Sequence, residues 1–215
     1  MGKILEATRA HKIIAILRGI DTRDIGWVID ALYAGGIRLL EVTFNQKSDT
    51  KIEDTVKAIR YVKEKYQNKM CVGAGTVMSI RELTAAHEVG AEFILSPNVD
   101  LTVIKEALKL GVAAIPGAMT PTEIIDAYEA GAEMVKLFPA GNLGLSYCKA
   151  IMAPINHVPL IAVGGIDADN LSAFLQAGFM GAGIGSNLID KVMINNHDYN
   201  GICQLALLYT EAAKK

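Results

Sequence analysis

The sequence contains few of the residues that build disulfide frameworks and metal sites. Its three cysteines (Cys71, Cys148 and Cys203) are widely spaced and form no C-x-x-C pair, which indicates reduced thiols. Its four histidines form neither an H-x-H nor an H-E-x-x-H pattern. We therefore expect no metal site.

The sequence also lacks a charge excess and a long apolar run. Its 21 Lys and Arg nearly balance 23 Asp and Glu, which argues against binding nucleic acid by phosphate neutralisation. No apolar run approaches the ~18 residues that span a bilayer. The first residues have no signal-peptide pattern, and Glu6 stands where a myristoylation signal has Ser or Thr. We expect a soluble, cytoplasmic protein that binds no membrane and no nucleic acid.

The sequence does contain a repeated pattern of helix-like stretches, glycines and short apolar runs. Five segments combine a helix-like stretch, a glycine and a short apolar run, and their glycines are Gly36, Gly90, Gly111, Gly131 and Gly178. Glycine ends helices well because it enters the left-handed region freely, and a strand then follows. Three further apolar runs, at 12–19, 70–77 and 159–165, bring the number of expected strands to eight.

The stretches between these runs have helical periodicity. Residues 22–34 place apolar side chains on one side, residues 121–130 open with a helix-start signal, and residues 199–215 are amphipathic. Apolar strands that alternate with helices form a parallel sheet covered by helices. Eight such units in 215 residues predict a (β/α)8 TIM barrel in the α/β class, as one domain over residues 1–215. An open doubly wound sheet is the alternative.

Two ionisable residues interrupt apolar strands. Lys136 lies between Val135 and Leu137, and burial would lower its pKa and make it a nucleophilic amine. Period-two alternation places Glu41, Thr43 and Asn45 on one face of their strand, where Glu41 is a candidate general base. The alternatives are a structural ion pair between Lys136 and Glu41, or a lysine that extends to solvent.

Barrel enzymes carry their catalytic groups at the carboxyl ends of the strands. Glycine-rich segments end the last two expected strands, at 163–167 and 183–187, and this is a frequent phosphate site in the fold. Arg18 and Thr76 also follow strands. They are candidate contacts for an anion and a carboxylate.

Six motifs in order, LLEVTFN, VGAGTV, FILSPNVD, IPGAMTPTE, VKLFPA and AVGGI, resemble the class I 2-keto-3-deoxy-6-phosphogluconate (KDPG) and 4-hydroxy-2-oxoglutarate (KHG) aldolases. The resemblance runs from about residue 4 to residue 190. It implies a homotrimer of barrels that cleaves a phosphorylated 2-keto sugar acid to pyruvate and glyceraldehyde 3-phosphate without a metal or cofactor.

The resemblance also implies a role for each matching residue. Lys136 would form the Schiff base and Glu41 would be the general acid and base. Thr76 would bind the pyruvate carboxylate, between walls formed by Pro97 and Phe138. The phosphate would bind the segments that hold Gly164, Gly165, Gly185 and Ser186.

Two positions depart from the pattern of many members. Asn45 stands where an arginine binds the carboxylate, and Val163 stands where a threonine influences stereochemistry at C4. At both positions the chain resembles the aldolases for the C4 epimer, 2-keto-3-deoxy-6-phosphogalactonate, and Arg18 would then bind the anion that Asn45 cannot. The preferred epimer is left open by the sequence, as is a physiological role for 4-hydroxy-2-oxoglutarate. The rival functions are a phosphosugar isomerase or epimerase without an imine, and a non-catalytic phosphosugar-binding protein.

Overall fold

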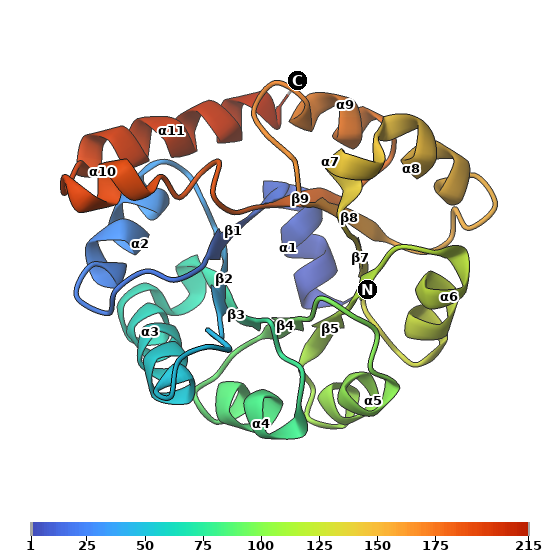
Figure 1. Cartoon of the computed structure of the whole chain (residues 1–215), viewed down its shortest axis with the longest axis horizontal. Coiled ribbons are helices and arrows are strands. Elements are labelled where there is room, and N and C mark those ends of the chain that lie inside the picture. The colour runs from blue at the N-terminus through green and yellow to red at the C-terminus, as the bar shows by residue number, and fades with distance from the viewer. Residues whose placement is uncertain (1, 215) are drawn as a thin grey trace.

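The computed structural model describes residues 2–214, which form a barrel of parallel strands surrounded by helices (Figure 1). The strands are β1 (Ile13–Leu17), β2 (Leu39–Thr43), β3 (Cys71–Gly75), β4 (Phe93–Leu95), β5 (Ala113–Ile115), β6 (Gly117–Ala118), β7 (Val135–Leu137), β8 (Leu160–Val163) and β9 (Gly181–Ile184). The helices are α1 (Lys3–His11), α2 (Ile25–Ala34), α3 (Lys51–Tyr66), α4 (Ile80–Glu88), α5 (Leu101–Lys109), α6 (Pro121–Glu129), α7 (Ala140–Leu143), α8 (Leu145–Met152), α9 (Leu171–Gln176), α10 (Lys191–Asn195) and α11 (Tyr199–Ala212), with a 3-10 turn at Gln67–Lys69.

The barrel closes through the fifth apolar run, which forms two short strands instead of one. β5 pairs with β4 and β6 pairs with β7, so the strand order is β5-β4-β3-β2-β1-β9-β8-β7-β6. Pro116 separates β5 from β6 because it has no N–H to donate, while its carbonyl accepts from Lys136 N at 2.9 Å. The predicted (β/α)8 barrel is confirmed, and the open-sheet alternative is wrong.

The glycine repeat marks the helix ends as expected. All five repeat glycines have positive φ, from 71° at Gly111 to 110° at Gly178. The helices predicted at 22–34, 121–130 and 199–215 correspond to α2, α6 and α11, each slightly shorter than expected. α6 begins with a capping box between Thr120 and Glu123.

Two apolar layers hold the barrel together. The outer layer lies between strands and helices and includes Leu40, Val42 and Phe44 of the β2 segment. The inner layer fills the barrel and includes Leu39, together with side chains from β1, β4, β5, β8 and α1. This alternation directs Glu41, which lies between Leu40 and Val42, toward the barrel interior.

Helix α1 closes one end of the barrel. Ile4 and Leu5 pack into the inner layer, and Leu5 N donates to Glu133 Oε1 at 2.7 Å. In Figure 1, α1 lies across the barrel opening behind the strands. The other end of the barrel, at the carboxyl ends of the strands, is therefore the end open to a ligand.

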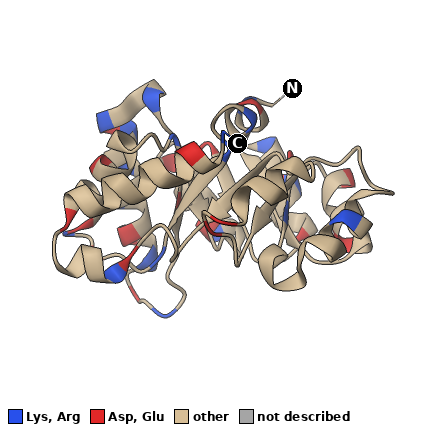
Figure 2. Ribbon diagram, turned by 90° about the horizontal axis from the view of Figure 1, so that it is seen from above, with Lys and Arg blue, Asp and Glu red and all other residues tan. Residues whose placement is uncertain are grey.

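Charge is distributed rather than gathered. In Figure 2, positive and negative segments are interspersed over the helices and loops in this view. Every helix within residues 2–214 is too short or too polar to cross a bilayer.

Candidate active site

A cavity of about 680 Å³ opens where the strands end. Most of the residues predicted for the site line it: Arg18, Thr76, Pro97, Lys136, Phe138, Val163, Gly164, Gly165, Gly185 and Ser186. The lining also includes Ile166, Gly183 and Asn187, from the two predicted glycine-rich segments, and four residues that were not predicted: Ile16, Gly19, Ile189 and Lys191. The cavity thus brings together residues from most strands of the barrel, whose loops lie far apart in the sequence.

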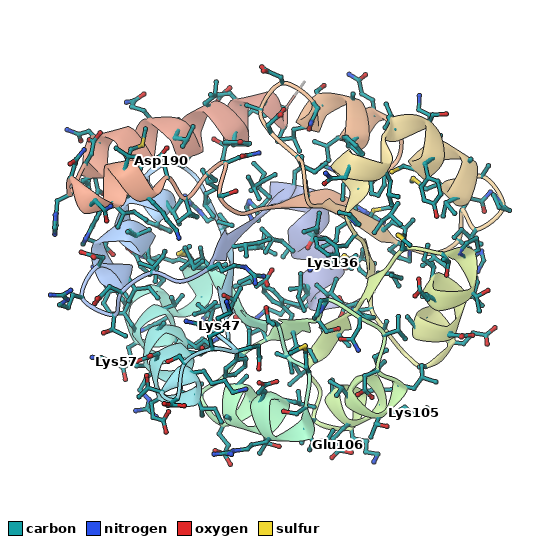
Figure 3. All side chains as sticks on the ribbon, in the orientation of Figure 1. Lys47, Lys57, Lys105, Glu106, Lys136 and Asp190 are labelled. Atoms are coloured by element: carbon teal, nitrogen blue, oxygen red, sulfur yellow. The ribbon has the colours of Figure 1, made fainter. Side chains whose placement is uncertain are left out.

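Lys136 is the buried amine of this cavity. The β7 register places it between Gly117 on β6 and Ile161 on β8, and its side chain is directed inward (Figure 3). The residue is 5% exposed. Burial lowers the pKa of its ammonium, an effect that Glu41 opposes and Arg18 reinforces. Its Nζ lies 4.7 Å from the centre of the Phe138 ring. A larger fraction of this amine is neutral and nucleophilic than in a solvated lysine.

Glu41 lies deeper than the cavity wall. It is 1% exposed, and its register neighbours are Ile16 on β1 and Gly73 on β3. Burial raises the pKa of its carboxyl, and the Lys136 and Arg18 charges partly offset this effect. Its Oε2 atom is buried without a hydrogen-bond partner in residues 2–214. A carboxyl with a raised pKa and a free oxygen is suited to exchange protons with a ligand near Lys136.

Gly75 makes room for this carboxylate. A Cβ atom at Gly75 would overlap Oε1 of Glu41, so any other residue there would displace the side chain. The next residue, Thr76, has a left-handed backbone with φ of 57°. Its hydroxyl accepts from Arg18 Nη2 at 3.4 Å, which joins two of the predicted anion contacts.

The glycine loops after β8 and β9 form the other side of the cavity. Gly164 and Gly165 have φ of 87° and 72°. The Gly164 carbonyl accepts from Gly141 N at 2.7 Å, and the Gly165 carbonyl accepts from Asn170 Nδ2 at 3.0 Å. These two hydrogen bonds hold the loop backbone in place. Because both residues are glycines, no side chain projects from these two positions into the cavity.

Asn45 was expected in the cavity, but it does not line it. It lines a separate cavity of about 70 Å³ with Thr43 and residues of β1, α2 and α3. The β2 strand ends at Thr43, and Asn45 begins a turn in which its carbonyl accepts from Ser48 N at 2.9 Å. The Thr43 hydroxyl donates to the Leu17 carbonyl at 3.1 Å, and Thr43 lines the same small cavity as Asn45. Of the three residues predicted to line the interior, Glu41 lies inside the barrel, whereas Thr43 and Asn45 line the smaller cavity.

The cavity is lined by more positively charged side chains than were predicted from the sequence. Among the described residues that line it, three are cations (Arg18, Lys136 and Lys191) and none is a carboxylate. Lys191 begins α10 shortly after the glycines of β9, and that position is a signal that could have identified it. Such a lining favours a ligand with more than one negative group. No cluster of three or more potential metal ligands occurs in residues 2–214.

Comparison with known proteins agrees with this geometry. The family model described as KDPG and KHG aldolase matches residues 4–205. The 2-dehydro-3-deoxy-6-phosphogalactonate aldolase of Escherichia coli is 36% identical over 82% of this chain and 83% of its own length. The KHG/KDPG aldolase of the same organism is 34% identical over 86% of this chain and 84% of its own.

Solved structures give the same result. A KDPG aldolase from Legionella pneumophila, with pyruvate captured as a covalent carbinolamine, has a TM-score of 0.83 and 26% identity, and the match covers 94% of this chain and 96% of that one. The KDPG aldolase of Zymomonas mobilis with 3-phosphoglycerate has a TM-score of 0.84 and 28% identity, and the match covers 97% and 95%. The chain belongs to the KDPG and KHG aldolase family and is a carbon–carbon lyase.

Proposed function

We propose that this aldolase cleaves 2-keto-3-deoxy-6-phosphogluconate to pyruvate and glyceraldehyde 3-phosphate through a Schiff base on Lys136. One observation carries the proposal: the cavity contains a 5%-exposed amine with a lowered pKa, within electrostatic reach of a buried carboxyl with a raised pKa. The carbinolamine captured in the Legionella pneumophila relative supports the same covalent chemistry.

The reaction begins when neutral Lys136 attacks the C2 ketone. Glu41 donates a proton as the carbinolamine loses water and becomes an iminium. Because Glu41 is buried and does not line the cavity, we expect a water molecule to carry this proton to the substrate. The iminium accepts the electron pair of the C3–C4 bond while Glu41 takes the C4 hydroxyl proton, which releases the aldehyde. The remaining enamine is protonated at C3, and hydrolysis then frees pyruvate and Lys136.

The other cavity residues bind the two ends of the substrate. Thr76 and Arg18 would hold the carboxylate next to Lys136, while Pro97 and Phe138 enclose the pyruvate portion. The phosphate would bind the opposite wall, at Gly164, Gly165, Gly185 and Ser186, with Lys191 as a nearby cation. The bound 3-phosphoglycerate in the Zymomonas mobilis relative supports a phosphate subsite.

The galactonate epimer is a second candidate substrate. Val163 lines the cavity where a threonine would otherwise act on C4 stereochemistry, and Asn45 lies outside the cavity. The 36%-identical relative is named for that epimer, whereas the 34%-identical relative is named for KHG and KDPG. Comparison of kcat/KM for both phosphorylated acids and for 4-hydroxy-2-oxoglutarate distinguishes the three.

Borohydride trapping tests the Schiff base. The protein is incubated with pyruvate, reduced, digested and analysed by mass spectrometry. The adduct is expected on the peptide containing Lys136 and is expected to be absent from Lys136→Met, whereas Lys105→Met, on the outer helix α5, retains it (Figure 3). A folded wild-type protein without an adduct would contradict the proposal and favour an isomerase or epimerase.

We also propose that the chain is a single-domain barrel that assembles as a homotrimer in the cytoplasm. Exposed apolar side chains on adjacent loops and helix starts support self-association: Met78, Ile80, Leu101 and Met119 are each 38–44% exposed. These residues lie in the segments that follow β3, β4 and β6, and exposed apolar side chains can form subunit contacts. Light scattering after size-exclusion chromatography tests the assembly, and a monomer mass would contradict it.

A further inference from the structure

The backbone at Thr76 needs support that its own residue type does not supply. Thr76 is β-branched, yet its φ of 57° lies in the left-handed region, which such residues rarely adopt. Strained backbone of this kind persists only where neighbouring contacts hold it, and it is concentrated at functional sites. The contacts that hold Thr76 therefore bear on the proposed carboxylate contact.

Two side chains hold the loop on either side of Val77. Gln46, in the loop after β2, donates from Nε2 to the Thr76 carbonyl at 3.1 Å. Glu82, on α4, accepts from the Met78 N–H at 2.7 Å through Oε2. Val77 N itself donates to the Leu95 carbonyl at 3.0 Å. Three consecutive residues are thus fixed by hydrogen bonds to three different elements of the fold.

Gln46 and Glu82 are joined to each other and to Lys51. Gln46 Nε2 also donates to Glu82 Oε1 at 2.9 Å. Lys51 Nζ donates to Gln46 Oε1 at 2.6 Å and to Glu82 Oε1 at 2.8 Å. The Gln46 amide is therefore oriented at both ends, with its nitrogen directed at the loop and its oxygen at Lys51.

Glu82 is a buried charge whose surroundings keep it ionised. It is 3% exposed, and burial alone would raise the pKa of its carboxyl. Hydrogen bonds from Lys51, Gln46 and Met78 outweigh burial and hold that pKa below its ordinary value. A fixed carboxylate at this position gives Gln46 and the loop one preferred arrangement.

We propose that Gln46, Lys51 and Glu82 form a loop clamp that positions Thr76, and that the clamp sets the affinity for the substrate carboxylate. Arg18 lies on the other side of the same threonine, with its Nη2 3.4 Å from Thr76 Oγ1, so a shift of the loop displaces both anion contacts. None of the three clamp residues lines the cavity, so each acts as a positioning residue. The inference rests on the proposed function, which assigns the carboxylate to Thr76 and Arg18.

The test measures borohydride trapping across a pyruvate titration, which gives a half-saturating concentration and a maximal trapping rate. Gln46→Ala should raise the half-saturating concentration about five- to twentyfold and change the maximal rate less than about twofold, because Lys136 is untouched. Thr76→Val, which retains the branched shape without the hydroxyl, should have an effect of similar size. In the Thr76→Val background, Gln46→Ala should add less than about twofold, because both changes act on one contact.

Controls separate positioning from general stability. Lys51→Met should raise the half-saturating pyruvate concentration. Lys57→Met, at an exposed position on the same helix, should leave it unchanged (Figure 3). Circular dichroism and thermal unfolding report whether each variant is folded. An unchanged half-saturating concentration in folded Gln46→Ala, or full additivity with Thr76→Val, would overturn the clamp. A wild-type protein that forms no adduct would instead overturn the proposed function.

Discussion

Replacing Lys136 with methionine tests the chemistry and the energetics of the site together. The substitution should abolish the pyruvate adduct and also stabilise the fold. The residue is 5% exposed among inner-layer side chains, and burial lowers the pKa of its ammonium despite the nearby Glu41. The charged form is therefore less favourable in the barrel than in water. Methionine has a similar length and no desolvation penalty.

The magnitude follows from exchanges of buried charges for apolar groups. Replacing a whole buried ion pair by apolar groups stabilises by about 1–4 kcal/mol. Lys136→Met removes only one charge, but Lys136 forms no salt bridge with Glu41 within residues 2–214, so we expect a gain at the lower end of that range, about 1–2 kcal/mol. For a chain of this size that corresponds to a rise in Tm of roughly 2–8 °C. Differential scanning calorimetry of the wild type, Lys136→Met and the control Lys105→Met measures this change in Tm. Lys105→Met is expected to change Tm by less than about 1 °C.

The pH dependence of this gain has a definite sign. Because the pKa of Lys136 is lower in the folded state than its ordinary 10.5, the wild type loses stability as pH falls from 10.5 through the folded value. The advantage of Lys136→Met should therefore be full below the folded pKa and should shrink as pH rises toward 10.5. A variant that is less stable than wild type at neutral pH would refute the reasoning, since it would mean that attraction to Glu41 outweighs burial.

Three further predictions concern other parts of the site. Glu41→Gln should lower kcat by about 10²–10⁴-fold while some adduct still forms, and Glu106→Gln on α5 should leave kcat unchanged; equal adduct and equal kcat would contradict the proton-transfer role. Lys191→Met should raise KM about three- to tenfold for phosphorylated acids but leave 4-hydroxy-2-oxoglutarate unaffected, and equal effects on both would exclude a phosphate contact. Gly75→Ala should lower both Tm and kcat, because its Cβ would overlap Glu41 Oε1; steady-state kinetics and calorimetry check this, and a fully active variant would show that the carboxylate is free to move.

The barrel could be predicted because its repeat depends on local chemistry. Glycine is favoured after a helix because it enters the left-handed region without strain, and all five repeat glycines do so. The strand at Pro116 was predicted as one run because its apolar composition is continuous. Its division into β5 and β6 depends on which neighbour accepts each half, β4 or β7, and that is a tertiary property.

Helix α1 was not predicted, because its role depends on the completed barrel. Its sequence has weak apolar content, and the side chains that matter, Ile4 and Leu5, gain burial only once the barrel end exists. The position of Asn45 was predicted incorrectly for a related reason. Strand alternation was extended two residues beyond the last strand residue, Thr43, into a turn that rotates the side chain away from the interior.

The difference between the site residues that the sequence revealed and those that it did not reflects the cost of burial. Lys136 and Glu41 were conspicuous because a charge inside an apolar strand is unfavourable unless it has a function. Gln46 and Lys191 are exposed, and only the position of Lys191 shortly after the β9 glycines distinguishes it from an ordinary surface residue. The role of a charged or polar loop residue can be assigned only when the fold shows which loops surround the cavity. In this barrel, sequence identifies the reacting groups, and structure is needed to find the groups that hold and select the substrate.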